Sequence, residues 1–222
     1  MPRADYTEHL AKRIAIQLFQ RKGVSTMSLY SLLLFVHVSG AVCLFAGMGT
    51  WLFGSIAMAR AARVEQVRAI ADLMLSVRLL VPVGALLVIT AGVAMTWLSW
   101  GFQTGWIVVA LASLGIIGPT GTWLIDPKVR ETAALAHTLP DGPVPAPLAK
   151  RACDRLVRIA LHTLIGMLFG IVFLMTAKPQ LVIAIGAVAA SALLGWATAL
   201  PLLRSQLDAR PHRYRQKKQH RS

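Results

Sequence analysis

Five long apolar runs, separated by short polar or basic stretches, dominate the chain. Each run reaches the length of about 20 mostly apolar residues that a membrane-spanning helix needs. The pattern predicts membrane helices at about residues 28–59, 74–100, 105–125, 156–177 and 181–203. The fold class that follows is all-α, a polytopic transmembrane helix bundle of five helices within residues 28–203.

Three segments lie outside these runs. Residues 1–27 form a basic N-terminal extension, for which we weigh an amphipathic helix on the outer surface, a weak extra crossing, or a natural translation start at Met27. Residues 127–155 form a proline-rich loop, predicted to be an extended cytoplasmic linker because closely spaced prolines interrupt a helix. Residues 204–222 form a basic tail, whose charge should attract anionic lipid headgroups.

Composition supports the membrane class. Hydrophobic residues make up 56% of the chain and charged residues 14%, whereas a soluble domain carries about a quarter charged residues. This excludes an ordinary cytosolic enzyme, a disordered chain and a soluble nucleic-acid binder. The net charge of +14 does not indicate nucleic-acid binding, because the basic residues lie mostly between and after the apolar runs, where they set topology.

The basic residues also predict the orientation. Lys and Arg are concentrated in the linkers after the first and third runs and in the tail, whereas the turn at residues 101–104 has no charge and the turn after the fourth run has only Lys178. The positive-inside rule then places the tail and both basic linkers on the cytoplasmic side of a bacterial inner membrane, with the N-terminus outside. An interfacial aromatic belt flanks the uncharged turn: Trp97, Trp100, Phe102 and Trp106.

Rows of small residues mark helix faces that can approach a neighbour closely. They are Gly40, Gly47 and Gly54 in the first run, Gly166 and Gly170 in the fourth, and Ser191, Gly195 and Ala199 in the fifth. The rows predict a compact bundle, and they would also suit contact with a larger membrane complex or a second copy of the chain.

Two histidines, His37 and His162, lie inside apolar runs, where ionisable residues are functional candidates. Both are candidate metal ligands for haem b. His162, Gly166 and Gly170 share one helix face, so a haem ring could lie on the glycine strip with the imidazole as axial ligand. A hydrogen-bonded structural histidine fits the same spacing. Their predicted depths leave a shared bis-histidine site open but do not require it.

Two arginines near the cytoplasmic boundary, Arg78 and Arg158, are candidates for binding haem propionates or phospholipid headgroups. Either could instead extend its charged group to the membrane surface or pair with Asp126. Weaker axial partners for iron are Met48, Met95 and Met167. The chain contains no Walker loop, dinucleotide fingerprint, HExxH or CxxC motif, so the residues assign no catalytic group.

About residues 28–177 resemble a known family. The resemblance lies in the fourth run and in the segments LYSLLLFVHVSGAV, VRLLVPVGALLVITAGV and GWIVVALASLGIIGPTGTWLIDPKV. The chain resembles a family of uncharacterised bacterial integral membrane proteins that carry a domain of unknown function. That family looks distantly like copper-resistance protein D and the HemJ-type haem membrane proteins. The resemblance implies that His37 is the position associated with haem.

Three hypotheses of function follow. The chain is a haem-b-binding or redox membrane protein, a non-catalytic subunit that packs against a larger membrane complex, or a carrier of a small molecule or metal. The scarcity of buried polar groups counts against a carrier. The absorption spectrum of the purified protein separates the first hypothesis from the other two.

The topology predicts the outcome of reporter fusions. Fusions after residues 65, 103, 140, 179 and 215 should report inside, outside, inside, outside and inside, because the basic linkers remain in the cytoplasm. Paired alkaline phosphatase and fluorescent-protein reporters provide the measurement. A periplasmic signal at residue 140 would contradict this topology.

Overall fold

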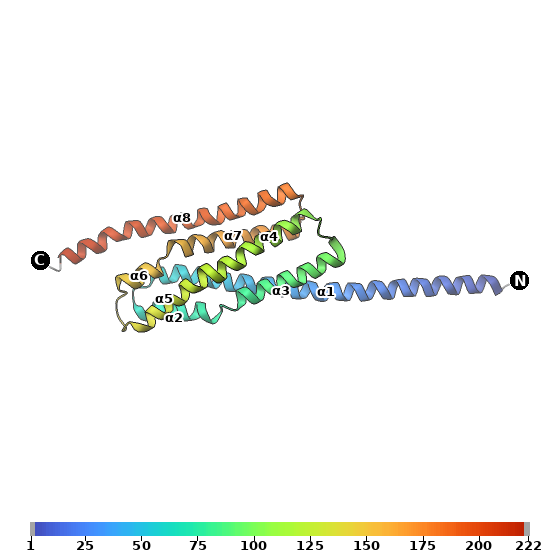
Figure 1. The fold of residues 1–222 in the computed structure, drawn as a ribbon, viewed down its shortest axis with the longest axis horizontal. Coiled ribbons are helices and arrows are strands. Elements are labelled where there is room, and N and C mark those ends of the chain that lie inside the picture. The colour runs from blue at the N-terminus through green and yellow to red at the C-terminus, as the bar shows by residue number, and fades with distance from the viewer. Residues whose placement is uncertain (1–2, 220–222) are drawn as a thin grey trace.

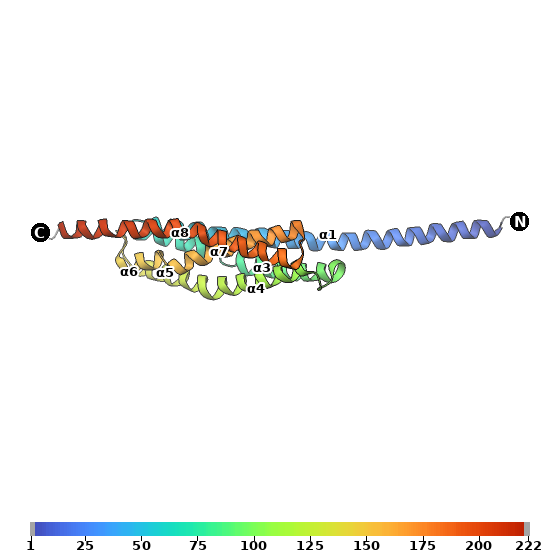
Figure 2. The ribbon, with the colours of Figure 1, turned by 90° about the horizontal axis from the view of Figure 1, so that it is seen from above.

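The computed structural model describes the backbone of residues 3–219 and the side chains of residues 29–201. The chain folds into helices, and the described residues form no β-sheet. The elements are α1 (Arg3–Arg60), α2 (Val64–Ser76), α3 (Leu80–Met95), η1 (Thr96–Trp100), α4 (Gly105–Pro119), η2 (Thr120–Ile125), α5 (Asp126–Thr138), α6 (Ala146–Ala152), α7 (Arg155–Ala177) and α8 (Leu181–Gln219). Figures 1 and 2 show an elongated bundle, with α1 projecting beyond one end and α8 beyond the other.

Among the described residues, five helical segments are long and apolar enough to cross a membrane, which confirms the predicted fold class. They are Leu29–Arg60, Val64–Trp100, Gly105–Thr138, Ala146–Ala177 and Leu181–Pro201. We call the end of the bundle at Arg63, Arg68 and Lys128 the basic end. We call the opposite end, at Trp97, Trp100, Phe102 and Trp106, the aromatic end.

The helices extend further at the basic end than the hydropathy pattern predicts. Residues 127–155 are not mainly an extended linker, because α5 covers the first part and the short α6 another. The prolines that interrupt a helix begin only at Pro140, whereas residues 128–138 contain none. The helix of α4 therefore continues through η2 into α5, and only residues 139–145 connect α5 to α6.

Proline also shapes the second membrane segment. The segment breaks between α2 and α3, just before Pro82, which has no N–H to donate within the helix. At the break, Arg78 N donates to Leu75 O rather than to Met74 O. The buried Trp51 indole nitrogen of α1 donates to Met74 O instead, at 3.0 Å. The carbonyl released by the break is thus satisfied by a neighbouring helix, as membrane interiors require.

The glycine row of α1 packs against α2 and α3. A Cβ placed on Gly40 would lie 2.9 Å from Gly84 O, and one on Gly84 would lie 2.6 Å from Leu44 N. Further along, Gly47 faces Val81 and Gly54 faces Met74. A side chain at Gly40 or Gly84 would therefore separate the two backbones.

The small residues of α7 and α8 pack against each other in the same way. A Cβ on Gly166 would lie 2.2 Å from Ser191 O, and one on Gly195 would lie 2.3 Å from His162 O. The Cα atom of Gly195 lies 3.1 Å from the Cβ position of Gly166. The two rows predicted separately from the sequence are thus the two sides of one interface.

Two predictions lie outside the described side chains. The backbone of residues 3–28 belongs to α1, and that of residues 202–219 belongs to α8. The amphipathic character proposed for residues 1–27 and the headgroup contacts proposed for residues 204–222 depend on side chains beyond the described range, so both remain predictions.

Two glycines of α8 provide a matched test of this packing. Gly195→Ala should reduce the free energy of unfolding by about 1–3 kcal/mol, because its methyl group meets the α7 backbone and forces the helices apart. The control Gly186→Ala adds its methyl group where no atom lies within 4 Å, and should be neutral or stabilise by up to about 1 kcal/mol. Unfolding in mixed detergent micelles, followed by circular dichroism, measures both. Equal changes in the free energy of unfolding for the two variants would contradict close packing of α7 on α8 at Gly195.

Candidate functional site

The basic end is closed by main-chain contacts between two connecting segments. Val64 N donates to Gly142 O at 2.8 Å, and Val144 N donates to Ala62 O at 3.0 Å. These bonds join the α1–α2 connection to the α5–α6 connection. The proline-rich segment is therefore held in place against the end of the bundle.

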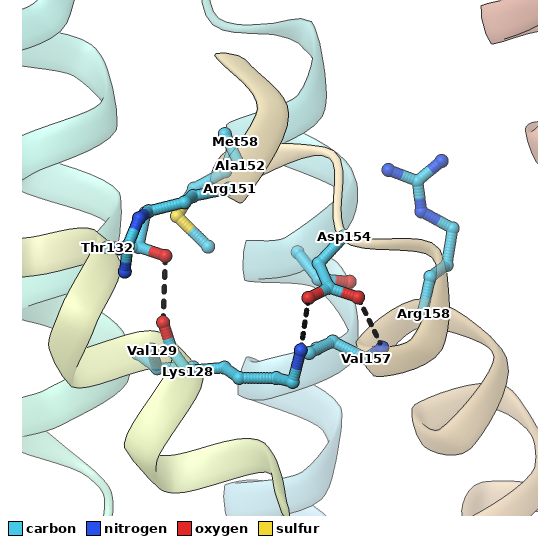
Figure 3. A pocket seen from close by; sticks show the side chains of 10 residues that line it. Met58, Lys128, Val129, Thr132, Arg151, Ala152, Asp154, Val157 and Arg158 are labelled. Carbon is cyan, nitrogen blue, oxygen red and sulfur yellow. Dashed lines mark hydrogen bonds and ion pairs between the residues drawn. The ribbon is translucent and has the colours of Figure 1, made fainter. Parts of the chain in front are cut away.

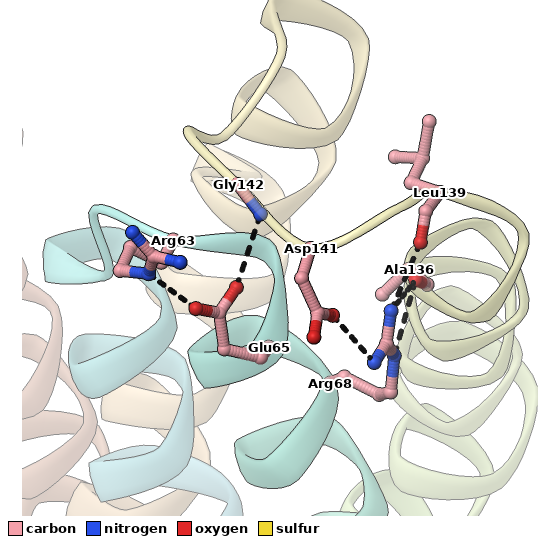
Figure 4. Close-up of polar contacts among 7 residues, drawn as sticks. All are labelled: Arg63, Glu65, Arg68, Ala136, Leu139, Asp141 and Gly142. Carbon is pink, nitrogen blue, oxygen red and sulfur yellow. Dashed lines mark hydrogen bonds and ion pairs between the residues drawn. The ribbon is translucent and has the colours of Figure 1, made fainter.

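Side chains strengthen this closure, as Figure 4 shows. The Arg68 guanidinium of α2 donates to three oxygens of the α5–α6 connection: Asp141 Oδ1 at 3.0 Å, Leu139 O at 2.9 Å and Ala136 O at 3.2 Å. Glu65 accepts from Gly142 N at 3.2 Å and also pairs with Arg63. The arginines in this network have a structural role.

A small pocket lies nearby, among α1, α5, α6 and α7 (Figure 3). Its volume is about 20 Å³, which suits about one water molecule. Lys128 Nζ lies 2.5 Å from Asp154 Oδ2, and Asp154 Oδ1 accepts from Leu156 N at 2.8 Å at the start of α7. The space is too small for an organic ligand, and its ion pair supports the turn into α7.

The structure separates the charged residues that the sequence grouped at this boundary. Asp126 pairs with Arg130 on its own helix, not with Arg78 or Arg158. Arg78 is exposed at the break between α2 and α3. Arg158 is buried on α7 and, in Figure 3, points away from the Lys128–Asp154 pair. Neither Arg78 nor Arg158 lines the larger cavity described below.

His162 lies in the interface between α7 and α8. Its Nδ1 is 2.8 Å from Thr198 Oγ1, and that hydroxyl donates its only proton to Gly195 O at 2.6 Å. Nδ1 of His162 is therefore the donor. Nε2 is buried and has no hydrogen-bond partner within the described part of the chain. This arrangement fits the structural histidine that the sequence analysis also considered.

The expectation of a haem ring on the glycine strip beside His162 is not met. Ser191 and Gly195 of α8 cover Gly166, and Val188 and Ser191 cover Gly170, at distances that leave no room for a Cβ atom without displacement. The strip exists because a second helix packs on it, and a planar ligand cannot occupy the same space.

A much larger cavity lies at the aromatic end, among α1, α3, α4 and the end of α7. Its volume is about 360 Å³, within the range of small-molecule and cofactor sites. Most of its wall is apolar, including Leu34, Val38, Val88, Ile107, Ala110 and Leu114. The polar and aromatic groups that line it are Tyr30, His37, Thr96, Trp100, Trp106 and Lys178.

His37 is the histidine that lines this cavity. Its Nδ1 is 2.9 Å from the main-chain oxygen of Val88. A carbonyl can only accept, so Nδ1 carries the proton and Nε2 retains its lone pair. Gly92 makes room for the ring, because a Cβ there would lie 3.2 Å from His37 Cε1. Helix α3 thus fixes both the orientation and the tautomer of the imidazole.

The two histidines do not share a site. Met175 lines the cavity of His37 and follows His162 by 13 residues along α7, which corresponds to about 20 Å. Of the three methionines proposed as axial partners, only Met95 lines the cavity, whereas Met48 and Met167 are buried elsewhere. A single bis-histidine haem is therefore incompatible with this fold.

Sequence reasoning did not assign Tyr30, Thr96, Met175 or Lys178 to a site, although all four line the cavity. Met175 comes from a different helix, and nothing in its local sequence marks it. Lys178 did carry a signal, since it is the only charged residue between Ile159 and Pro201. Trp100 and Trp106, predicted as an interfacial belt, contact each other edge to face with ring centroids 5.7 Å apart, and both also line the cavity.

Within residues 29–201, no three His, Cys, Asp or Glu side chains gather as they would around a metal ion. No curated protein and no solved structure matches the chain. The family model described as "Predicted integral membrane protein (DUF2269)" matches residues 31–179, about two thirds of the chain, and the chain belongs to this family of integral membrane proteins.

Proposed function

We propose that the protein binds haem b in the cavity at the aromatic end, with His37 as an axial ligand. The observation that carries the proposal is the hydrogen bond from His37 Nδ1 to Val88 O. It fixes the tautomer in which Nε2 is free to coordinate, the arrangement typical of metal-bound histidines. His37 is also the position to which the sequence resemblance assigns haem.

The surrounding residues suit such a cofactor. The wall is mainly aliphatic and aromatic, and two thioethers, those of Met95 and Met175, line the same space and would be further candidates to hold the iron. Porphyrin nitrogens supply four ligands, so the site needs no cluster of three protein ligands. His162, Arg78 and Arg158 have no part in this proposal, because none of them lines the cavity.

The chain's own contribution is position and environment. Val88 O holds the imidazole plane, and Gly92 provides the space that the ring needs. The apolar wall lowers the local dielectric constant, which shifts a redox potential. When bound, haem b supplies one-electron chemistry. A redox role in the membrane is therefore the activity that this site supports best.

We also propose the orientation given by the positive-inside rule, with the basic end on the cytoplasmic side of a bacterial inner membrane. The cavity then lies in the outer half of the bilayer. In this orientation α1 projects outside and α8 projects inside.

A second candidate function is that of a non-catalytic subunit. Gly115 and Gly118 of α4 have no atom within 4 Å of their Cβ positions, and Gly115 is exposed beside Ile116, which is 54% exposed. A helix of another membrane protein could approach α4 closely there. Protein that remains colourless with ample haem favours this candidate.

The two histidines provide a matched pair for testing haem binding. Protein expressed with a haem precursor should show a Soret band and a pyridine haemochrome spectrum of b type. His37→Ala should lose most of the bound haem because the axial nitrogen is removed, whereas His162→Ala should retain it and lose only stability. Gly92→Ala should reduce the haem content in part by crowding the imidazole. Equal loss in both histidine variants, or wild-type protein without haem, would contradict the proposal.

A further inference from the structure

Lys178 is unusual in both place and conformation. It ends α7 with a φ of 48° and a ψ of 51°, in the left-handed region. Glycine is favoured at this helix end because other residues are strained there. Among the described residues, Lys178 is the only non-glycine residue with positive φ.

The charge of Lys178 is also unusual. Between Leu79 and Ile125, and between Ile159 and Pro201, it is the only Asp, Glu, Lys or Arg. The positive-inside rule accounts for the arginines of the basic end, but not for a cation at the aromatic end. Its side chain is directed by Trp100, since Nζ lies 4.3 Å from the ring centroid, within cation–π range.

Both Lys178 and Trp100 line the cavity of His37. The described lining residues include no carboxylate, so the ammonium has no acidic partner there. The cavity thus combines a mainly apolar body with one cationic group at its rim, because Lys178 is exposed. A neutral ligand would contact only the apolar wall of the cavity. A ligand with a terminal carboxylate would contact both the apolar wall and Lys178.

We infer that Lys178 is an anion-binding group of this cavity, and that the cavity is selective for hydrophobic carboxylates, molecules with an apolar body and an ionised carboxyl end. The carboxylate binds Lys178 Nζ by a charge-assisted hydrogen bond. Trp100 keeps the ammonium at the rim, and the apolar body lies against the aliphatic wall. The inference deepens the proposed function, since it rests on the cavity holding a ligand, and haem b itself carries carboxylates.

The test compares two probes with the same polyene body, retinoic acid and retinol, at pH 8.5, where a free carboxyl is ionised and Lys is protonated. Full-length protein in nanodiscs reports binding by energy transfer from tryptophan to the polyene. Ala110→Phe, which fills the cavity from its buried wall, gives the background from probe dissolved in lipid. The wild type should bind retinoic acid about tenfold more tightly than retinol, the effect expected of a hydrogen bond to a charged group.

Lys178→Gly is the decisive variant, and Lys178→Arg is its control. Glycine suits the left-handed conformation, so Lys178→Gly should fold with unchanged or higher thermal stability while losing the preference for the acid. Lys178→Arg should keep that preference. Equal binding of acid and alcohol by the wild type, a preference that survives in Lys178→Gly, or binding unaffected by Ala110→Phe would each overturn the inference.

The preference for retinoic acid over retinol does not depend on haem coordination. Retinoic acid needs no axial ligand, so His37→Ala should keep the preference for the acid even though it loses haem. Colourless protein with a Lys178-dependent preference would contradict the proposed function and leave this inference standing. Haem binding that requires His37, without any effect of Lys178 on the preference for retinoic acid, would support the proposed function and overturn this inference.

Discussion

Close contact between helix backbones at glycines is the interaction on which the bundle depends. In a bilayer, lipid chains are as apolar as leucine, so helices gain little from burying apolar surface against each other. Contact at short range supplies the attraction instead. Gly40 and Gly84 bring α1 against α3, and Gly166 and Gly195 bring α7 against α8. Edge-to-face packing of Phe45 on Phe169, with ring centroids 5.5 Å apart, then joins α1 to α7.

The cavity is a consequence of how these contacts are distributed. The tight pairing of α1 with α3 holds from Gly47 to Gly40, but the next α3 glycine, Gly92, faces the imidazole of His37 rather than another backbone. The aromatic end is therefore less tightly packed than the middle of the bundle. At the basic end, hydrogen bonds between the connecting segments close the structure. The basic end is therefore closed by hydrogen bonds, whereas the aromatic end contains the cavity.

The sequence predicts some levels of this structure and not others. Hydropathy predicts five membrane helices because each must satisfy its own backbone within the bilayer. It does not predict that α4 continues into α5, because Asp126–Thr138 is polar and begins with an Asp–Pro pair, although residues 128–138 contain no proline. Spacing predicts the glycine row at Gly166 and Gly170, but not the helix that covers it. His37 is predicted from its depth in the membrane, whereas the cavity beside it requires residues as distant as Tyr30 and Lys178.

The contrast between His37 and His162 shows why a residue type and its depth do not define a site. Both rings donate from Nδ1, one to the main-chain oxygen of Val88 and the other to the hydroxyl of Thr198. The difference lies at Nε2. For His162, Nε2 is buried, and the helix that supplies Thr198 covers the adjacent glycine strip. For His37, the partner is the backbone of α3, and α4 and the end of α7 leave a cavity beside the ring. The surroundings of Nε2, rather than the residue type, therefore distinguish His37 from His162.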